Sequence, residues 1–230
     1  MDFFERQWSS YRAIVEHDLM EHQAVAQATA AAIDAWLAAR PAAAAPKPQM
    51  VDLGCGDLAL LAPLLQRLPL ASYTGLDLTA AVLPLAQRAL GEVPYASRWI
   101  EGDLLAWATD DNDATPVDLL HSAFAIHHLS DEQKATFLQA ARRRIAPDGL
   151  FIWVDVFREA GEDRGTYIAR YQQRIATGWP QLSAEQQEHC SSHLAAYDIP
   201  ADRDKIAQVA AASGWNWRWG WQGAHQAEAL

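Results

Sequence analysis

A glycine-containing turn that follows an apolar strand is the part of this sequence most suited to bind a ligand. The apolar run 51–53 is followed by Gly54, Cys55, Gly56 and Asp57. Glycine has no Cβ, so the backbone of such a turn can approach a bound molecule closely. A tight connection between a strand and a helix would need the same residues, so the turn alone does not establish a binding site.

Acidic residues at the ends of the next two predicted strands extend this pattern. Asp77 lies twenty residues after Asp57, at a position where a carboxylate can accept hydrogen bonds from both hydroxyls of a ribose. Asp103 follows the third predicted strand. The carboxyl ends of parallel strands meet at one edge of a sheet, so we expect these side chains to face a single crevice.

The charge of the turn distinguishes between two classes of cofactor. A nicotinamide dinucleotide carries a negatively charged pyrophosphate, which Asp52 and Asp57 would repel. S-adenosylmethionine carries an ammonium group and a sulfonium, which the same carboxylates would attract. Leu58, near which we expect the following helix to begin, also takes the place of the third glycine in the dinucleotide fingerprint. The turn therefore favours S-adenosylmethionine.

These segments resemble the motifs of the class I S-adenosylmethionine-dependent methyltransferases. The first motif of that family is similar to 51–57, its adenine-contacting segment to 101–103, its fourth motif to 118–129 and the turn before its fifth strand to 147–150. The resemblance covers about 49–155. It implies S-adenosylmethionine as the cofactor. We expect methyl transfer to a small-molecule acceptor, whose accepting O, N or C atom the sequence does not indicate.

The resemblance also assigns individual residues to the cofactor. It implies that Gly54 and Gly56 lie beside the methionine moiety, Asp77 at the ribose and Phe124 near the reacting end. The remaining residues that we expect at the cofactor are Asp52, Cys55 and Leu78, with Asp103 and Leu104 at the adenine. Leu58 departs from the family, which usually has a small residue there, and this affects the expected packing of the turn against its helix.

Apolar runs of strand length alternate with helical patterns through most of the chain. The predicted strands are 49–53, 73–77, 97–101, 117–121 and 150–157. Such alternation is typical of parallel βαβ units that helices bury on both sides. The sequence thus predicts an α/β, Rossmann-like fold. Its mostly parallel seven-stranded sheet should have helices on both faces and an antiparallel C-terminal strand pair.

The chain divides into two parts in this interpretation. Residues 1–48 form an N-terminal helical cover, helical over about 8–40, and a proline-containing linker. Residues 49–230 form the methyltransferase-like domain, with a helical insertion at about 158–204. Tryptophan at every second position of 215–221 predicts a strand with one aromatic face, which either packs against a helix or stacks on a ligand.

Two histidines and an aspartate are the candidate catalytic residues. His127 and His128 follow the fourth predicted strand, Asp155 ends the fifth, and His121 is a further candidate base. Histidine titrates near neutral pH and suits general-base catalysis, which contributes about 10²–10⁴-fold. The histidines could instead cap and orient the following helix. Methyl transfer depends mainly on alignment, so a base is useful without being required.

Residues of the cover and the insertion are candidates for a lid over the crevice. Tyr11 lies in the cover, Tyr167 and Tyr171 lie in the insertion, and Arg158 follows the fifth predicted strand at the same edge. A lid of this kind would exclude water from the reaction. Packing between the covering helices is the alternative role.

One short segment of the insertion has residue types that bind metals. His189, Cys190 and His193 lie within about one turn of a predicted helix. No acidic partner is fixed by their spacing, so we expect no metal site.

Composition and charge narrow the remaining possibilities. The chain has 18 Lys and Arg against 29 Asp and Glu, a net charge of −11, and no basic run longer than 142–144. We therefore expect no nucleic-acid partner and assign the arginines to a helix end.

The N-terminus lacks a signal-peptide pattern, no segment could span a membrane, and the two cysteines suit a reducing compartment, so we expect a cytoplasmic protein. The oligomeric state is not indicated.

Two other function classes remain open at this point. A nicotinamide-dependent oxidoreductase would use a similar crevice, and a preference for a dinucleotide would identify it. A non-catalytic cofactor-binding or partner-binding module would bind the cofactor without turnover.

Overall fold

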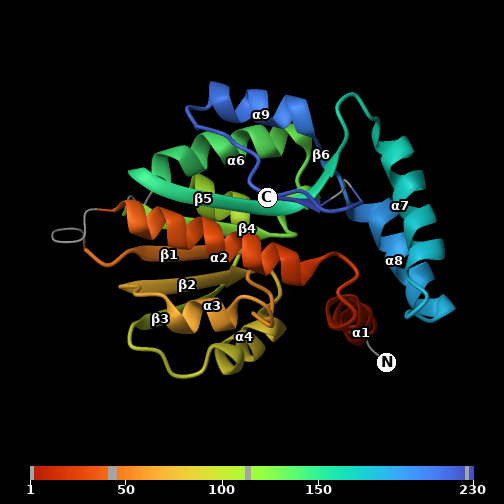
Figure 1. Cartoon of the computed structure of the whole chain (residues 1–230), viewed down its shortest axis with the longest axis horizontal. Coiled ribbons are helices and arrows are strands. Elements are labelled where there is room, and N and C mark those ends of the chain that lie inside the picture. The colour runs from red at the N-terminus through yellow and green to blue at the C-terminus, as the bar shows by residue number, and fades with distance from the viewer. Residues whose placement is uncertain (1–2, 41–45, 112–114, 226–227) are drawn as a thin grey trace.

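A seven-stranded sheet forms the centre of the protein within residues 3–40, 46–111, 115–225 and 228–230, which the computed structural model describes. The strand order is β3-β2-β1-β4-β5-β6, with β7 paired to β5, and among these described strands only the β5–β7 pairing is antiparallel (Figure 1). The strands are β1 (Gln49–Leu53), β2 (Ser72–Asp77), β3 (Ala96–Glu101), β4 (Val117–Ala123), β5 (Ile145–Arg158), β6 (Ala201–Asp202) and β7 (Glu228–Ala229). The predicted α/β fold is confirmed.

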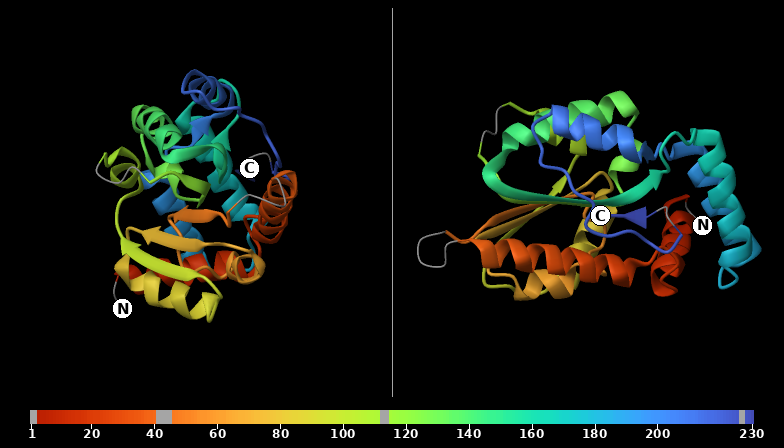
Figure 2. Two further views of the ribbon diagram at one scale, coloured as in Figure 1. Left: turned by 90° about the vertical axis from the view of Figure 1, so that its left-hand side faces the viewer. Right: turned by 45° about the horizontal axis from the view of Figure 1, so that its top comes forward.

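Helices cover both faces of this sheet (Figure 2). On one face, Ile33, Leu65 and Ala86 from three helices pack with the apolar side chains of the central strands. On the other face, Leu138 and Ile206 belong to a second buried cluster. The first layer consists of α2 (His22–Ala39), α3 (Ala62–Arg67) and α4 (Leu83–Leu90), and the second of α5 (Leu104–Thr109), α6 (Asp131–Arg144) and α9 (Arg203–Ala212).

Three further helices lie beyond the carboxyl ends of the strands, as Figure 1 shows: α1 (Phe3–Glu16), α7 (Arg164–Gly178) and α8 (Ala184–Tyr197). Asp18 and Glu21 have φ of 53° and 55°, so the helical region expected at 8–40 is two helices, α1 and α2. Helices α7 and α8 lie within the region 158–204 and share a buried cluster that includes Tyr167, Trp179 and Leu194.

The first half of β5 differs from the expectation. The turn predicted at 147–150 lies inside β5, which begins at Ile145. Between two successive pairings, β4 advances from Val117 to Leu119 while β5 advances from Ile145 to Leu150. The extra residues of β5 form a bulge, so the strand continues through Pro147 and Gly149.

Two local predictions near the ends of the domain are wrong. The helix expected near Leu58 begins at Ala62, because Leu58 has φ of 59° and cannot start a right-handed helix. The expected strand at 215–221 is absent from the described backbone, which has only an isolated bridge from Gln222 to Ala229 nearby. The alternating tryptophans still share a side: Trp217 and Trp219 pack edge to face on Trp153 and Phe157 of β5. Aromatic packing holds the tryptophans of this segment, and backbone hydrogen bonds with Leu230 hold its end at Gly220 and Trp221.

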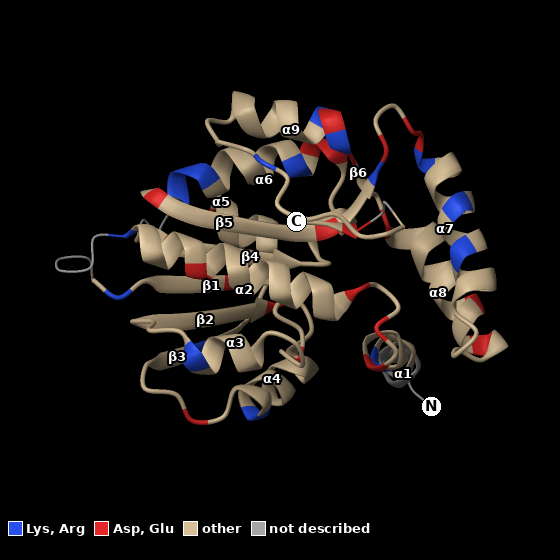
Figure 3. Ribbon diagram, in the orientation of Figure 1, with Lys and Arg blue, Asp and Glu red and all other residues tan. Residues whose placement is uncertain are grey.

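In the view of Figure 3, lysines and arginines are spread over several helices and loops, among aspartates and glutamates. The three consecutive arginines end α6, as expected, and Arg142 donates to the carbonyl of Gly214. In the described chain, no helix combines the length and the apolar character needed to cross a membrane.

Candidate functional site

A cavity of about 610 Å³ lies where the carboxyl ends of the strands meet the covering helices. All nine residues expected at the cofactor line it: Asp52, Gly54, Cys55, Gly56, Asp77, Leu78, Asp103, Leu104 and Phe124. Side chains from α1, α2, α7 and α8 close the other side. The structure thus brings residues far apart in the sequence to one place.

The glycines of the turn after β1 have conformations that other residues rarely adopt. Gly54 has φ of 73° and Gly56 has φ of 56°. A Cβ on Gly54 would lie 2.5 Å from the Cβ of Ala125, in the loop after β4. Both N–H groups that begin the turn, those of Gly54 and Cys55, donate to the carbonyl of Leu76. The turn is therefore fixed between β2 and the end of β4, with its backbone toward the cavity.

Asp77 connects this turn to the end of β2. Its Oδ2 accepts a hydrogen bond from the N–H of Gly56 at 2.9 Å, and its Oδ1 accepts one from the N–H of Thr79 at 2.8 Å. Each carboxylate oxygen retains a lone pair that a ribose hydroxyl could use. Burial raises the pKa of Asp77 above its ordinary value, although the two N–H groups act in the opposite direction. Asp103 similarly caps α5 through the N–H of Ala106 at 2.7 Å.

Asp52 belongs to a buried polar network beneath the turn. Its carboxylate accepts a hydrogen bond from the hydroxyl of Tyr73 at 3.0 Å and lies 2.7 Å from Nδ1 of His121. Burial raises the pKa of Tyr73 well above its ordinary value, so its hydroxyl stays protonated as the donor. His121, a candidate base in the sequence, therefore serves to hold Asp52 at the bottom of the cavity.

His127 and Asp155 form a tight buried pair at the ends of β4 and β5. Nδ1 of His127 lies 2.5 Å from Oδ1 of Asp155, and the N–H of His127 donates to Oδ2 at 2.9 Å. Trp153 and the N–H of Val156 also donate to this carboxylate. Burial would raise the pKa of Asp155, but the charge of His127 and these hydrogen bonds hold it below its ordinary value. His127 lines the cavity, whereas Asp155 lies behind it and fixes the ring.

The loop after α8 brings a second carboxylate to the other side of His127. Oδ1 of Asp198 lies 3.6 Å from Nε2 of His127. The N–H of Ile199 donates to the carbonyl of His127 at 2.8 Å. The buried Lys134 donates to the carbonyls of Leu129 and Ile199. These contacts hold Asp198 at the cavity wall. The sequence did not predict this position.

Replacement of Lys134 by methionine is expected to lower the free energy of unfolding by about 1–3 kcal/mol. The substitution removes the ammonium group and leaves the carbonyls of Leu129 and Ile199 without their buried donor. Chemical denaturation monitored by circular dichroism would measure the change, with the exposed Lys47→Met as the matched control. Equal stability of the two variants would contradict the role assigned to Lys134.

The residues expected in the lid separate into two groups. Tyr11 and Tyr171 line the cavity. Tyr167 is fully buried between the covering helices and does not line it. Arg158 donates to the carbonyls of Pro200 and Glu162 and therefore holds the loops around α7 together, away from the cavity.

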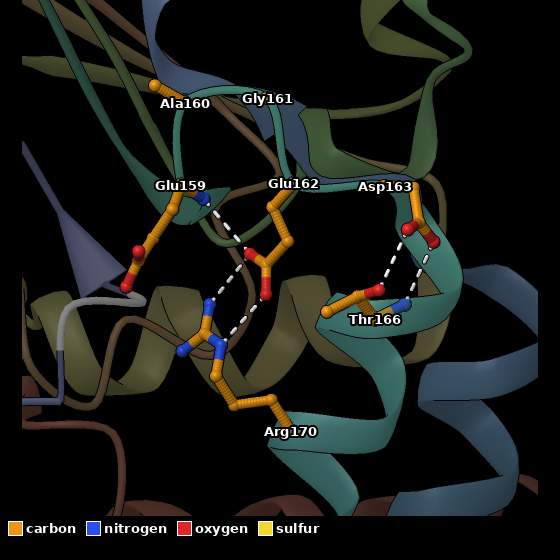
Figure 4. A pocket seen from close by; sticks show the side chains of 7 residues that line it. All are labelled: Glu159, Ala160, Gly161, Glu162, Asp163, Thr166 and Arg170. Atoms are coloured by element: carbon orange, nitrogen blue, oxygen red, sulfur yellow. Dashed lines mark hydrogen bonds and ion pairs between the residues drawn. The ribbon is translucent and has the colours of Figure 1, made fainter.

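A second hollow of about 410 Å³ lies beside the loop from β5 to α7 (Figure 4). Its charged groups bind one another: Arg170 donates to both carboxylate oxygens of Glu162 at 2.9 Å, and Asp163 caps α7 through Thr166. These contacts stabilise the start of α7.

The main cavity fits S-adenosylmethionine better than a dinucleotide. The described residues that line it include five carboxylates and no lysine or arginine. Such a surface attracts a sulfonium and an ammonium group and repels a pyrophosphate. The absence of a Cβ on Gly54 lets the turn pack against Ala125, and Asp77 holds the turn through the N–H of Gly56 beside the cavity. Leu58 is buried in its left-handed conformation, so its bulk packs inward and leaves the turn intact.

Several residues of this site were not identified from the sequence. Trp179 and His22 line the cavity, and His22 packs edge to face against Phe124 with ring centroids 5.3 Å apart. Burial lowers the pKa of His22 to about 4. Phe124 itself has φ of 52°, an unusual conformation that turns the chain at the end of β4. Such tertiary contacts have no signal in a single sequence.

Comparison with known proteins agrees with the geometry. The sequence profile of a family described as a methyltransferase domain matches residues 51–151. A trans-aconitate 2-methyltransferase of Azoarcus sp. (strain BH72) is 38% identical over 101 residues, which cover 44% of this chain and 36% of that protein. An uncharacterized methyltransferase of Mycobacterium tuberculosis (strain ATCC 25618 / H37Rv) is 34% identical over 86 residues, 37% of this chain and 40% of that protein. The chain thus aligns with less than half of each relative.

Solved structures share the fold at low sequence identity. The plantazolicin methyltransferase BpumL, in complex with a triazolic desmethylPZN analog and SAH, matches with a TM-score of 0.58 and 15% identity, covering 86% of this chain and 67% of that chain. The cyclopropane synthase MmaA2 from Mycobacterium tuberculosis matches with a TM-score of 0.53 and 19% identity, covering 80% and 59%. The matched methyltransferase domain and the convergence of the expected motifs on one cavity make this chain similar to the class I S-adenosylmethionine-dependent methyltransferases, and this similarity supports S-adenosylmethionine as the cofactor.

Proposed function

We propose that this protein transfers the methyl group of S-adenosylmethionine to a small, neutral and largely apolar acceptor. The observation that carries this proposal is the convergence of all nine expected cofactor residues on one cavity. The transfer is an in-line attack of the acceptor on the sulfonium methyl. The protein contributes mainly by holding the two reactants in line and by excluding water, which can supply about 7–11 kcal/mol.

The lining of the cavity supports a neutral acceptor. Apolar side chains from the covering helices and the loops beside them line the cavity, including Ile14, Met20, Ile175 and Trp179. The described lining contains carboxylates but no lysine or arginine that could bind an anionic acceptor. One relative is named for trans-aconitate; we propose that the acceptor here differs from such a polycarboxylate.

We propose His127 as the base that removes the proton of the acceptor. Asp155 holds Nδ1 of His127, which leaves Nε2 as the nitrogen available to accept a proton. His128 lies with its ring centroid 4.0 Å from that of His127, and burial and the neighbouring charge lower its pKa to about 4. His128 is thus neutral and supports the pair as a polar neighbour.

The rate of methyl transfer is expected to increase with pH, with a midpoint above pH 6.5. Burial alone would lower the pKa of His127, but the carboxylates of Asp155 and Asp198 outweigh burial and hold it above its ordinary value of 6.5. A base must be unprotonated to act, so activity is low below that pKa and increases as the pH passes through it. The measurement is kcat/KM against pH, and a flat profile between pH 6 and 9 would exclude His127 as the base.

Transfer of radiolabelled methyl groups tests the class of acceptor. The purified protein would be incubated with labelled S-adenosylmethionine and with neutral phenols or apolar alcohols in one series and trans-aconitate in another. We expect label in a neutral acceptor. Methylation of trans-aconitate alone would contradict the proposed acceptor class, and cofactor binding without turnover on any acceptor would favour a non-catalytic module.

A further inference from the structure

Four polar side chains converge on one side of the cavity without ordinary hydrogen bonds between them. Oδ1 of Asp198 lies 3.6 Å from Nε2 of His127, 3.8 Å from Nδ1 of His128 and 3.8 Å from Nε2 of His193. This oxygen is buried and has no hydrogen-bond partner among the described residues. A buried carboxylate oxygen that lacks a hydrogen-bond partner is energetically unfavourable, so three imidazoles around such an oxygen indicate that something else binds there.

The separations match those between ligands of one metal ion. Hydrogen bonds between nitrogen and oxygen usually span about 2.7–3.2 Å, so all three contacts are too long. Around a tetrahedral ion with bonds of about 2.1 Å, two ligand atoms lie about 3.4 Å apart. One ligand atom each from His127, His128 and Asp198 also lies within 4.8 Å of the other two.

We propose that His127, His128 and Asp198 bind a single divalent transition-metal ion of the zinc type, with a fourth position open toward the cavity. Two imidazoles and one carboxylate form a ligand set that zinc favours, and three protein ligands with one open position are typical of catalytic sites. His193 lies beside this position and is only partly buried. The sequence did not predict the site, because its three ligands come from two distant segments.

Neighbouring groups orient the proposed ligands. With Nδ1 of His127 engaged by Asp155, Nε2 is the remaining ligand atom of this ring, 3.6 Å from Oδ1 of Asp198. A carboxylate behind a ligand histidine is the usual second partner of such a site. Nδ1 of His128 has only a long contact of 3.4 Å with the carbonyl of Tyr197, which would be exchanged for the metal bond.

With this ion bound, the proposed methyl transfer would favour an acceptor that has a hydroxyl group. The open position of the ion faces the same cavity as Phe124, so the ion could bind and acidify a hydroxyl of the acceptor in place of the free base His127. Only this consequence rests on the proposed function. Metal binding by the three residues can be measured without any acceptor or cofactor.

Titration of the untagged, chelator-treated protein with Zn²⁺ by calorimetry, and with Co²⁺ by visible absorption, tests the site. We expect saturation near one ion per chain and the intense visible bands of tetrahedral Co²⁺. Asp198→Asn should weaken the affinity by at least about 10- to 100-fold, the loss typical even for partners behind the ligands. His128→Gln, at a half-exposed side chain, provides a second ligand variant with less effect on folding.

The exposed His17→Gln is the matched control and should bind metal as the unmodified protein does. Absence of saturable binding, or equal affinity in the Asp198 and His128 variants that retain their folded circular dichroism spectrum, would overturn the proposal. Titration of each variant with S-adenosylmethionine separates the two proposals. Cofactor binding without metal binding overturns only the metal site, and metal binding without cofactor binding overturns only the proposed function.

Discussion

Replacement of His127 by glutamine is expected to lower kcat for methyl transfer by about 10²–10⁴-fold, the usual contribution of a positioned proton acceptor. The loss is expected whether His127 acts as the free base or as a ligand of the proposed ion, because Nε2 is lost in both cases. The glutamine amide can still donate to Asp155, which limits the effect on folding. Kinetics at saturating cofactor would measure kcat, and calorimetry would show that cofactor affinity changes little.

Two variants separate this chemical role from a structural one. Asp155→Asn keeps the shape of the side chain but removes the charge that holds the pKa of His127 above its ordinary value, so the limb of the pH profile should move to lower pH. His17→Gln, at an exposed position outside the cavity, should leave kcat unchanged. A His127→Gln enzyme with kcat within about threefold of the unmodified protein would exclude this residue from the chemistry.

Replacement of Asp77 by alanine is expected to raise the dissociation constant of S-adenosylmethionine by about 10- to 150-fold. This range corresponds to the loss of a hydrogen bond to a charged group, worth about 1.5–3 kcal/mol. The substitution removes the proposed ribose contact and also the acceptor of the N–H groups of Gly56 and Thr79. Both effects act on the same end of the cavity, and calorimetric titration would measure their sum.

A second substitution separates the ribose contact from the shape of the turn. Asp77→Asn keeps an oxygen that can accept from the N–H of Gly56 but loses the charge, so its affinity should lie between those of the alanine variant and the unmodified protein. Asp34→Ala removes only the exposed ion pair with Arg67 and should bind normally. Unchanged affinity in both Asp77 variants would remove this residue from the cofactor site.

The sheet and the cofactor end of the cavity could be predicted because their determinants are local. Gly54 and Gly56 follow an apolar strand, and Asp77 ends the next one, so parallel pairing alone brings them together. The alternation of strands and helices likewise determines the layers. A single sequence contains these signals in its spacing.

The acceptor side of the cavity depends on contacts that spacing does not reveal. Asp198 reaches His127 only because Lys134 and the N–H of Ile199 attach the loop after α8 to the end of β4. The segment 215–221 has the period of a strand, yet it forms no strand: its tryptophans pack on β5, and its backbone hydrogen bonds with Leu230 are confined to Gly220 and Trp221. At both places tertiary packing decides the outcome, and local preference does not.

Calorimetric titration of the purified protein with S-adenosylmethionine and with its demethylated product, beside a nicotinamide dinucleotide, tests the central claim most directly. The arrangement of Gly54, Gly56 and Asp77 around a cavity whose described lining has five carboxylates and no lysine or arginine predicts saturable binding of the first two compounds and none of the dinucleotide. Binding of the dinucleotide alone, or of none of the three, would contradict the assignment of this cavity to S-adenosylmethionine.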